Sequence, residues 1–328
     1  MPYQERQNRH DKEEPDIQIS SQLPLADGLA HMVDLLDDID YQPTLPKFKL
    51  ANRKINDVLG ITSRCIVVSS TSSDGNQVAI KGVQDHRGTA SPDTLEKEIM
   101  VLEKAKGGIN LPQLTGYTAN FLEFSFTPVG EGLSPLKVNA MPGSLPSIMD
   151  GICDGLNFIH SQDIIHRDIR WDNIILVDKN RPVIIDFNSA TTANVPVHFS
   201  GGYICCPPEV LELGSATLEY TPIPAHDWKA YVLLLHSAIF PRLYKNFVVC
   251  WVLNKDSEES KALRQLWTSL GASTIWKRGL EAAEAANIDD ELRLWVRDFL
   301  TIFPDAEQRL QNLFASVRVR PEEVVSTG

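Results

Sequence analysis

The chain has 328 residues, a hydrophobic fraction of 43% and a formal net charge of −12. This length is too great for one small domain and suits two lobes, or one large domain with tails. The acidic balance argues against a nucleic-acid-binding surface and against a basic membrane anchor. The apolar runs are too short to span a bilayer, and the five cysteines lack zinc-ligand spacing. We therefore expect a soluble intracellular protein in the cytoplasm, with the nucleus left open.

Residues 1–45 are expected to form an acidic tail, because they hold ten acidic and only three basic residues. The first 26 residues have no apolar period, which predicts disorder. Within Gly28–Tyr41 apolar residues recur at helical spacing. A short helix packed on the main body is the simpler interpretation. The alternative is an acidic docking segment for a partner protein.

The segment 46–128 is predicted to consist mainly of strands around one helix. The turn residues of Ser72–Asn76 predict a hairpin. A helix is predicted to begin at Ser91-Pro92-Asp93 and to end at Gly107-Gly108. Strands are predicted at Ile55–Gly60, Cys65–Thr71, Gln77–Lys81, Leu111–Tyr117 and Phe121–Phe126.

Residues 129–318 have mainly helical character, and Leu145–Gln162 is a long amphipathic segment. Residues 319–328 are expected to be a short C-terminal tail. The pattern therefore predicts an α+β protein with two lobes, a small antiparallel sheet lobe with one helix and a larger, mainly helical lobe.

The stretch Ile164–Asn173 holds the most informative spacing in the chain. It contains Asp168 and Asn173, and after one apolar strand a second carboxylate follows at Asp186. In phosphoryl-transfer sites one carboxylate orients the attacking hydroxyl. An amide oxygen and another carboxylate hold Mg²⁺ against the nucleotide phosphates. The spacing therefore indicates phosphoryl transfer.

At these residues the chain resembles the eukaryotic protein kinase family. The family's catalytic loop reads H-R-D-x-x-x-x-N, its metal motif reads D-F-G and its lysine strand reads V-A-I-K. Here the corresponding residues are His166–Asn173, which we call the catalytic loop, Asp186-Phe187-Asn188 and Val78–Lys81. The resemblance covers roughly residues 46–318. It implies a bilobal fold, ATP and Mg²⁺ as cofactors, and a protein substrate with a hydroxyl acceptor.

The resemblance also implies the site residues. Asp168 is the catalytic base, Arg170 neutralises phosphate charge, and Lys81 contacts the α- and β-phosphates. Glu98 is preferred over Glu96 and Glu103 as the partner of Lys81. Asn173 and Asp186 bind the metal. The remaining nucleotide-binding residues implied are Gly60, Thr62, Val67 and Ala79.

Other residues match scaffold positions of the family. His166 and Phe187 are expected to stack between the lobes, and Glu209 to pair with Arg309. Arg167 has two interpretations, an anchor for a phosphorylated activation segment or a structural arginine bound to backbone carbonyls.

Two motifs depart from the family pattern. In the phosphate loop Gly60 and Val67 are kept, but Thr62 and Cys65 replace the other glycines. Asn188 replaces the glycine at the last position of the metal motif, and asparagine tolerates a left-handed backbone. The leading hypothesis is a divergent protein kinase, with serine or threonine favoured over tyrosine as acceptor. The alternatives are a non-catalytic kinase-fold binding module and a small-molecule phosphotransferase.

Overall fold

An antiparallel five-stranded sheet forms the first part of the described chain, in the order β1-β2-β3-β5-β4. The computed structural model describes residues 55–61, 65–72, 74–83, 93–178, 180–213, 219–244, 257–285 and 291–302. The acidic tail, with its predicted helix, and the C-terminal tail lie outside these ranges. The strands are β1 (Ile55–Ile61), β2 (Cys65–Thr71), β3 (Gln77–Val83), β4 (Gln113–Tyr117) and β5 (Glu123–Thr127).

The hairpin between β2 and β3 follows the predicted turn. Ser72 N donates to Asn76 O at 2.8 Å, and Gly75 has a φ of +82°, which glycine adopts without strain. The last two strands begin two residues later than predicted. Phe121 instead ends a tight turn, where its N–H donates to Thr118 O and its φ is +53°.

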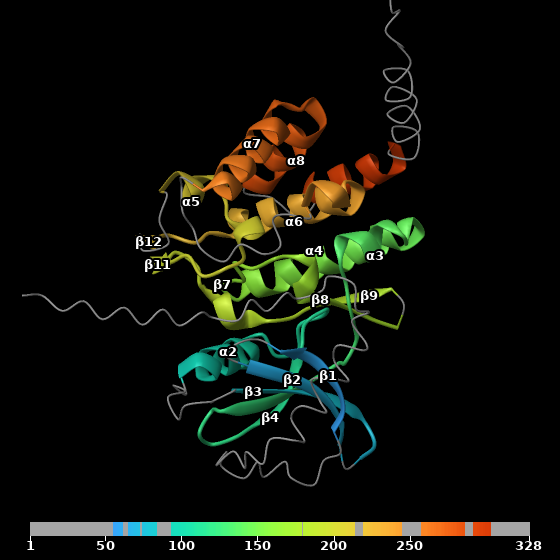
Figure 1. The fold of residues 1–328 in the computed structure, drawn as a ribbon, viewed down its shortest axis with the longest axis vertical. Coiled ribbons are helices and arrows are strands. Elements are labelled where there is room, and N and C mark those ends of the chain that lie inside the picture. Colours follow the sequence, from blue (N-terminus) through green and yellow to red (C-terminus); the bar gives the residue numbers. More distant parts are fainter. Residues whose placement is uncertain are drawn as a thin grey trace, which may run out of the picture. The chain divides into compact units, whose positions relative to one another are not determined.

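Helix α2 (Asp93–Lys104) lies beside this sheet (Figure 1). Its buried stripe contains Leu95, Ile99 and Leu102, which recur at the 3.6-residue period of a helix. The helix ends earlier than predicted, and a turn leads to Gly107, whose φ is +82°. We call β1–β5 and α2 the sheet lobe.

The second part of the chain, the helical lobe, is built around α4 (Leu145–Ser161) and α6 (Pro224–Ile239). Every residue of α6 from His226 to Ile239 is buried, as expected for a helix surrounded by other elements. The other helices are α3 (Pro135–Asn139), α5 (Pro208–Leu213), α7 (Glu258–Ala272), α8 (Thr274–Glu284) and a helix over residues 291–302.

Short strands in the helical lobe hold the loops that carry polar side chains. Strands β6 (Glu131–Gly132), β8 (Ile174–Val177) and β9 (Arg181–Ile184) form one sheet. The other two pairs are β7 (Ile164–Ile165) with β10 (Thr191–Thr192), and β11 (Val197–His198) with β12 (Glu219–Tyr220).

One hydrophobic core joins the two lobes. It runs from Ala79 and Phe124 in the sheet, through Phe187, to Trp228 in α6. The predicted α+β class with a small sheet lobe and a larger helical lobe is confirmed.

Candidate active site

The catalytic loop lies between β7 and β8, and Asp227 of α6 holds its first residues by hydrogen bonds. The Asp227 carboxylate accepts the backbone N–H of His166 at 2.7 Å and that of Arg167 at 2.8 Å. Burial alone would raise the pKa of Asp227, but hydrogen bonding to His160 and nearby charge lower it below its ordinary value. A charged acceptor therefore holds the start of the loop.

Asp168 is buried and bonded on both carboxylate oxygens. Oδ2 accepts from Asn173 Nδ2 at 2.8 Å, and Oδ1 accepts from Gly202 N at 2.6 Å. Arg170 Nε lies 3.4 Å from the carboxylate, and Arg170 Nη1 donates to Asp172 Oδ2 at 2.9 Å. The structure thus brings Asp168, Arg170 and Asn173 together, as their spacing predicts.

Gly202 was not singled out as a functional residue by the sequence motifs. A Cβ atom added there would lie 2.9 Å from Asp168 Oδ1, and one at Gly201 would lie 2.0 Å from Arg167 O. Two successive glycines therefore allow the segment after β11 to pack directly on the catalytic loop. The sequence signal is the Gly-Gly pair itself, but its partner is visible only in three dimensions.

Lys81 joins the sheet lobe to the helical lobe. Its Nζ lies 2.7 Å from Glu98 Oε2 and 2.8 Å from Asp186 Oδ1. Burial alone would lower the pKa of Lys81, but the charges of Glu98 and Asp186 outweigh it and raise the pKa. Lys81 is therefore held as a cation between two carboxylates.

Glu98 reaches Lys81 because it lies on the buried stripe of α2, three residues after Leu95 and four before Leu102. Its Oε1 also accepts the backbone N–H of Phe187 at 3.2 Å. Glu103 is exposed and Glu96 half-buried, and Glu98 is the glutamate that the structure brings to Lys81.

Asp186 follows β9 and has a left-handed backbone, with φ 65° and ψ 71°. Its side chain is 38% exposed. Burial raises the pKa of Asp186, but the charge and hydrogen bond of Lys81 lower it further, so the net direction is downward. Asn188 lies in the short 3-10 helix Phe187–Ser189, and its φ is not positive. The left-handed position therefore belongs to Asp186 and not to Asn188.

His166 and Phe187 stack with ring centroids 4.7 Å apart. His166 Nε2 lies 3.1 Å from Ile185 O, and Phe187 is fully buried in the same core as Leu102. These contacts match the structural role expected of both residues.

Arg167 is buried, and its guanidinium bonds neutral groups. Nε donates to the Tyr220 hydroxyl at 2.9 Å, Nη1 donates to Ser189 O at 2.9 Å, and Nη2 donates to His198 O. Of the two interpretations of Arg167, the contacts favour the structural one, with Tyr220 as a partner that the motif did not reveal.

Glu209 pairs with a lysine of α6 that the sequence motifs did not single out. Its carboxylate pairs with Lys229 of α6, which also lies 2.8 Å from Glu284 Oε1. Arg309 lies outside the described residues. A buried cation on α6 therefore makes the contact, which spacing along the chain does not indicate.

Four of the predicted nucleotide-binding residues lie on three neighbouring strands: Gly60, Val67, Ala79 and Lys81. Gly60 of β1 is paired with Val67 of β2, and Val67 is paired with Lys81 of β3. Ala79 is on the same face of β3 as Lys81, since side chains alternate along a strand. Thr62 lies outside the described residues.

The oxygen atoms at the site suit a hard divalent cation. Asn173 uses its amide nitrogen to donate to Asp168, so its amide oxygen is the atom available to a cation. Asp186 supplies a carboxylate, and Mg²⁺ is commonly bound by one or two such side chains together with substrate phosphates.

None of the helices in the described ranges is long and apolar enough to cross a membrane.

Human serine/threonine-protein kinase TAO3 is 26% identical over 156 residues, which are 46% of this chain and 16% of TAO3. Cyclin-dependent kinase 14 of Xenopus laevis is 27% identical over 193 residues, 56% of this chain and 44% of that protein.

A third relative is serine/threonine-protein kinase D of Synechocystis, 36% identical over 100 residues, which are 29% of this chain and 19% of the relative. This chain thus matches less than half the length of each of these relatives. The sequence profile described as "Protein kinase domain" matches residues 54–246, more than half of the chain. The chain therefore belongs to the protein kinase family.

Proposed function

We propose that the protein transfers the γ-phosphoryl group of Mg-ATP to a serine or threonine hydroxyl of a protein substrate. The observation that carries the proposal is the double contact of Lys81 with Glu98 and Asp186. This contact joins the nucleotide side of the site to the carboxylate that would bind the metal.

In the proposed reaction Lys81 binds the nucleotide phosphates, and Glu98 holds the Lys81 side chain in position. Gly60, Val67 and Ala79 border the nucleotide. Asn173 and Asp186 would hold Mg²⁺, which would supply positive charge next to the nucleotide phosphates. The lowered pKa of Asp186 keeps its carboxylate ionised at neutral pH, as a metal ligand requires.

Asp168 orients the acceptor hydroxyl and receives its proton. Its hydrogen bonds from Asn173 and Gly202 fix the carboxylate in one orientation, so little reorganisation is needed when substrate binds. Arg170 stays charged at any physiological pH and is close enough to neutralise phosphate charge. Serine or threonine is proposed as acceptor because TAO3 and the Synechocystis relative are named serine/threonine kinases.

The second candidate is a kinase-fold binding module that does not catalyse transfer. Side chains at Thr62 and Cys65 favour it, because glycine lets a backbone approach phosphate closely and a side chain hinders that approach.

The test is transfer of radiolabel from γ-labelled ATP to an array of serine, threonine and tyrosine peptides. Asp168→Asn is expected to reduce transfer by at least about 100-fold, the range for loss of a general base. The matched control is Asp163→Asn, because Asp163 is exposed and its φ of 55° is one that asparagine adopts readily.

Label on serine or threonine peptides with wild type, lost in Asp168→Asn, supports the proposal. Binding of ATP without transfer to any acceptor would favour the binding module instead. Transfer to sugars or small alcohols but not to peptides would identify a small-molecule phosphotransferase.

A further inference from the structure

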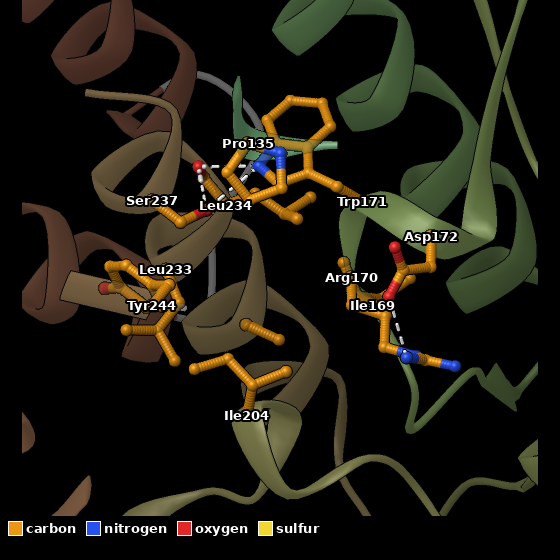
Figure 2. Close-up of a pocket in the computed structure, with 11 residues that line it drawn as sticks. Pro135, Ile169, Arg170, Trp171, Asp172, Ile204, Leu233, Leu234, Ser237 and Tyr244 are labelled. Carbon is orange, nitrogen blue, oxygen red and sulfur yellow. Dashed lines mark hydrogen bonds and ion pairs between the residues drawn. The ribbon is translucent and has the colours of Figure 1, made fainter. Parts of the chain in front are cut away.

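A pocket with about 450 Å³ of empty space, part of it open to solvent, lies beside the catalytic loop (Figure 2). Its walls come from the catalytic loop, from the short 3-10 helix Tyr203–Cys205 and from α6. Most of the lining is apolar, with Ile169, Ala230 and Leu233 buried at its inner wall. Concave pockets with mainly apolar walls and a few polar groups are the usual form of ligand sites.

The polar atoms of the inner wall are already paired. Trp171 Nε1 donates to Ser237 Oγ at 2.9 Å and to Leu234 O at 3.2 Å. The Tyr244 hydroxyl pairs with His236 Nδ1 at 2.6 Å. A charged group that entered would lose water without gaining a partner, whereas an apolar group would gain from burial.

The two charged lining residues lie together on one side of the pocket. Figure 2 shows Arg170 and Asp172 there, joined by a hydrogen bond of 2.9 Å. The Asp172 side chain is 45% exposed. The pocket therefore has an apolar interior and a polar entrance.

The same two chain segments form the pocket and hold Asp168. The residues directly after Asp168 line the pocket, and Arg170 lies between Asp168 and Asp172. In the second segment, Gly202 N donates to Asp168 Oδ1, and Ile204, two residues later, lines the pocket. An extended chain advances by roughly 3.3–3.6 Å per residue. The pocket is thus within a few residues of a hydroxyl bound at Asp168.

We propose that this pocket receives one large apolar side chain, such as leucine, of the protein substrate, located a few residues from the acceptor hydroxyl. The inference rests on the proposed function and adds a substrate class to it. The occupant is the substrate segment because the pocket is continuous with the acceptor position.

The experiment uses the full chain and peptides with one serine in an alanine–glycine background. Leucine, phenylalanine, alanine, arginine or aspartate is placed singly at each of four positions on both sides of the serine. Transfer of label from ATP is measured, and fluorescence polarisation measures binding of a labelled leucine peptide. Wild type is expected to favour leucine over alanine at one position by at least about tenfold in kcat/KM.

Two variants change the pocket. Ile204 is only partly buried, so Ile204→Trp is expected to narrow the pocket without unfolding the chain, and to bring the leucine-to-alanine ratio close to one. Ile204→Ala widens the pocket and is expected to shift the preference from leucine to phenylalanine. The matched control is Ile275→Trp on α8, where Ile275 is 53% exposed and outside the pocket, and its ratio should equal that of wild type.

The outcomes separate this inference from the proposed function. Transfer to peptides with no apolar preference, or with a preference that neither Ile204 variant alters, would overturn the pocket and leave the kinase activity standing. If the leucine peptide binds wild type but not Ile204→Trp in the polarisation assay, and no transfer is detected, the proposed role of the pocket is supported and the proposed kinase activity is overturned. Neither binding nor transfer would overturn both.

Discussion

Removal of the Lys81 charge, by Lys81→Met, is predicted to lower stability as well as nucleotide use. The Lys81 and Glu98 side chains are only 10% and 3% exposed. Removing one partner of a buried ion pair typically costs about 3–5 kcal/mol, because the other charge is left uncompensated. The half-exposed Asp186 adds little to this figure.

The expected loss corresponds to a decrease in Tm of roughly 6–20 °C for a domain of this size. Native proteins have a free energy of unfolding of about 5–15 kcal/mol, so the variant should remain folded at low temperature. The burial of Glu98 is the reason for the predicted decrease in stability.

The pH range in which this pair affects stability should move downward in the variant. In the wild type the pKa of Lys81 is raised above its ordinary value of 10.5 by Glu98 and Asp186, against the effect of burial. The stability gained from Lys81 is therefore complete below pH 10.5 and lost as the pH rises through the higher folded-state value.

In the variant, burial acts on Glu98 without an opposing cation. In the wild type, burial already raises the pKa of Glu98 above its ordinary value of 4.5, even though the charge of Lys81 acts in the opposite direction. The folded variant then holds a proton more tightly than the unfolded chain does, and its stability should fall as the pH rises from 4.5 through the raised value.

Urea unfolding at pH 6 and pH 8 measures this effect for wild type, Lys81→Met, Glu98→Gln and the double variant. The double variant should be more stable than the sum of the single changes predicts, without recovering transfer activity. The matched control is Lys137→Met, since the Lys137–Glu131 pair is exposed and worth about 0–1 kcal/mol. Wild-type stability of Lys81→Met at pH 8 would refute the reasoning.

Three further changes test how the catalytic loop is held. Asp227→Asn should lower the free energy of unfolding by about 2–5 kcal/mol, because an amide offers one oxygen where the carboxylate accepts two backbone N–H bonds. An unchanged urea midpoint would contradict this. Gly201→Ala places a Cβ 2.0 Å from Arg167 O, which would displace the catalytic loop, and should reduce phosphoryl transfer by up to about 100-fold. Gly271→Ala serves as the control, because a Cβ there meets nothing within 4 Å. Tyr220→Phe removes the hydroxyl that accepts a hydrogen bond from Arg167 and should lower the free energy of unfolding by about 1–3 kcal/mol. An unchanged Tm in thermal unfolding would show that this bond contributes nothing to stability.

Local pattern was enough to predict the five strands and the helix of the sheet lobe. The turn after β2 depends on residues within one hairpin, and the stripe of α2 depends on a 3.6-residue period. Both are read from neighbours along the chain. The start of β5 was displaced by two residues, because the tight turn that ends at Phe121 with a positive φ carries no strong residue signature.

Motif spacing predicted which charged side chains the site has, and only the tertiary structure decided which of them meet. Lys81 and Asp186 are 105 positions apart and are joined because the sheet lobe packs on the helical lobe. Glu209 pairs with Lys229, and Arg167 pairs with Tyr220 and backbone carbonyls. The physical reason is that the energy of a charge pair depends on distance and burial, and both are set by packing in three dimensions.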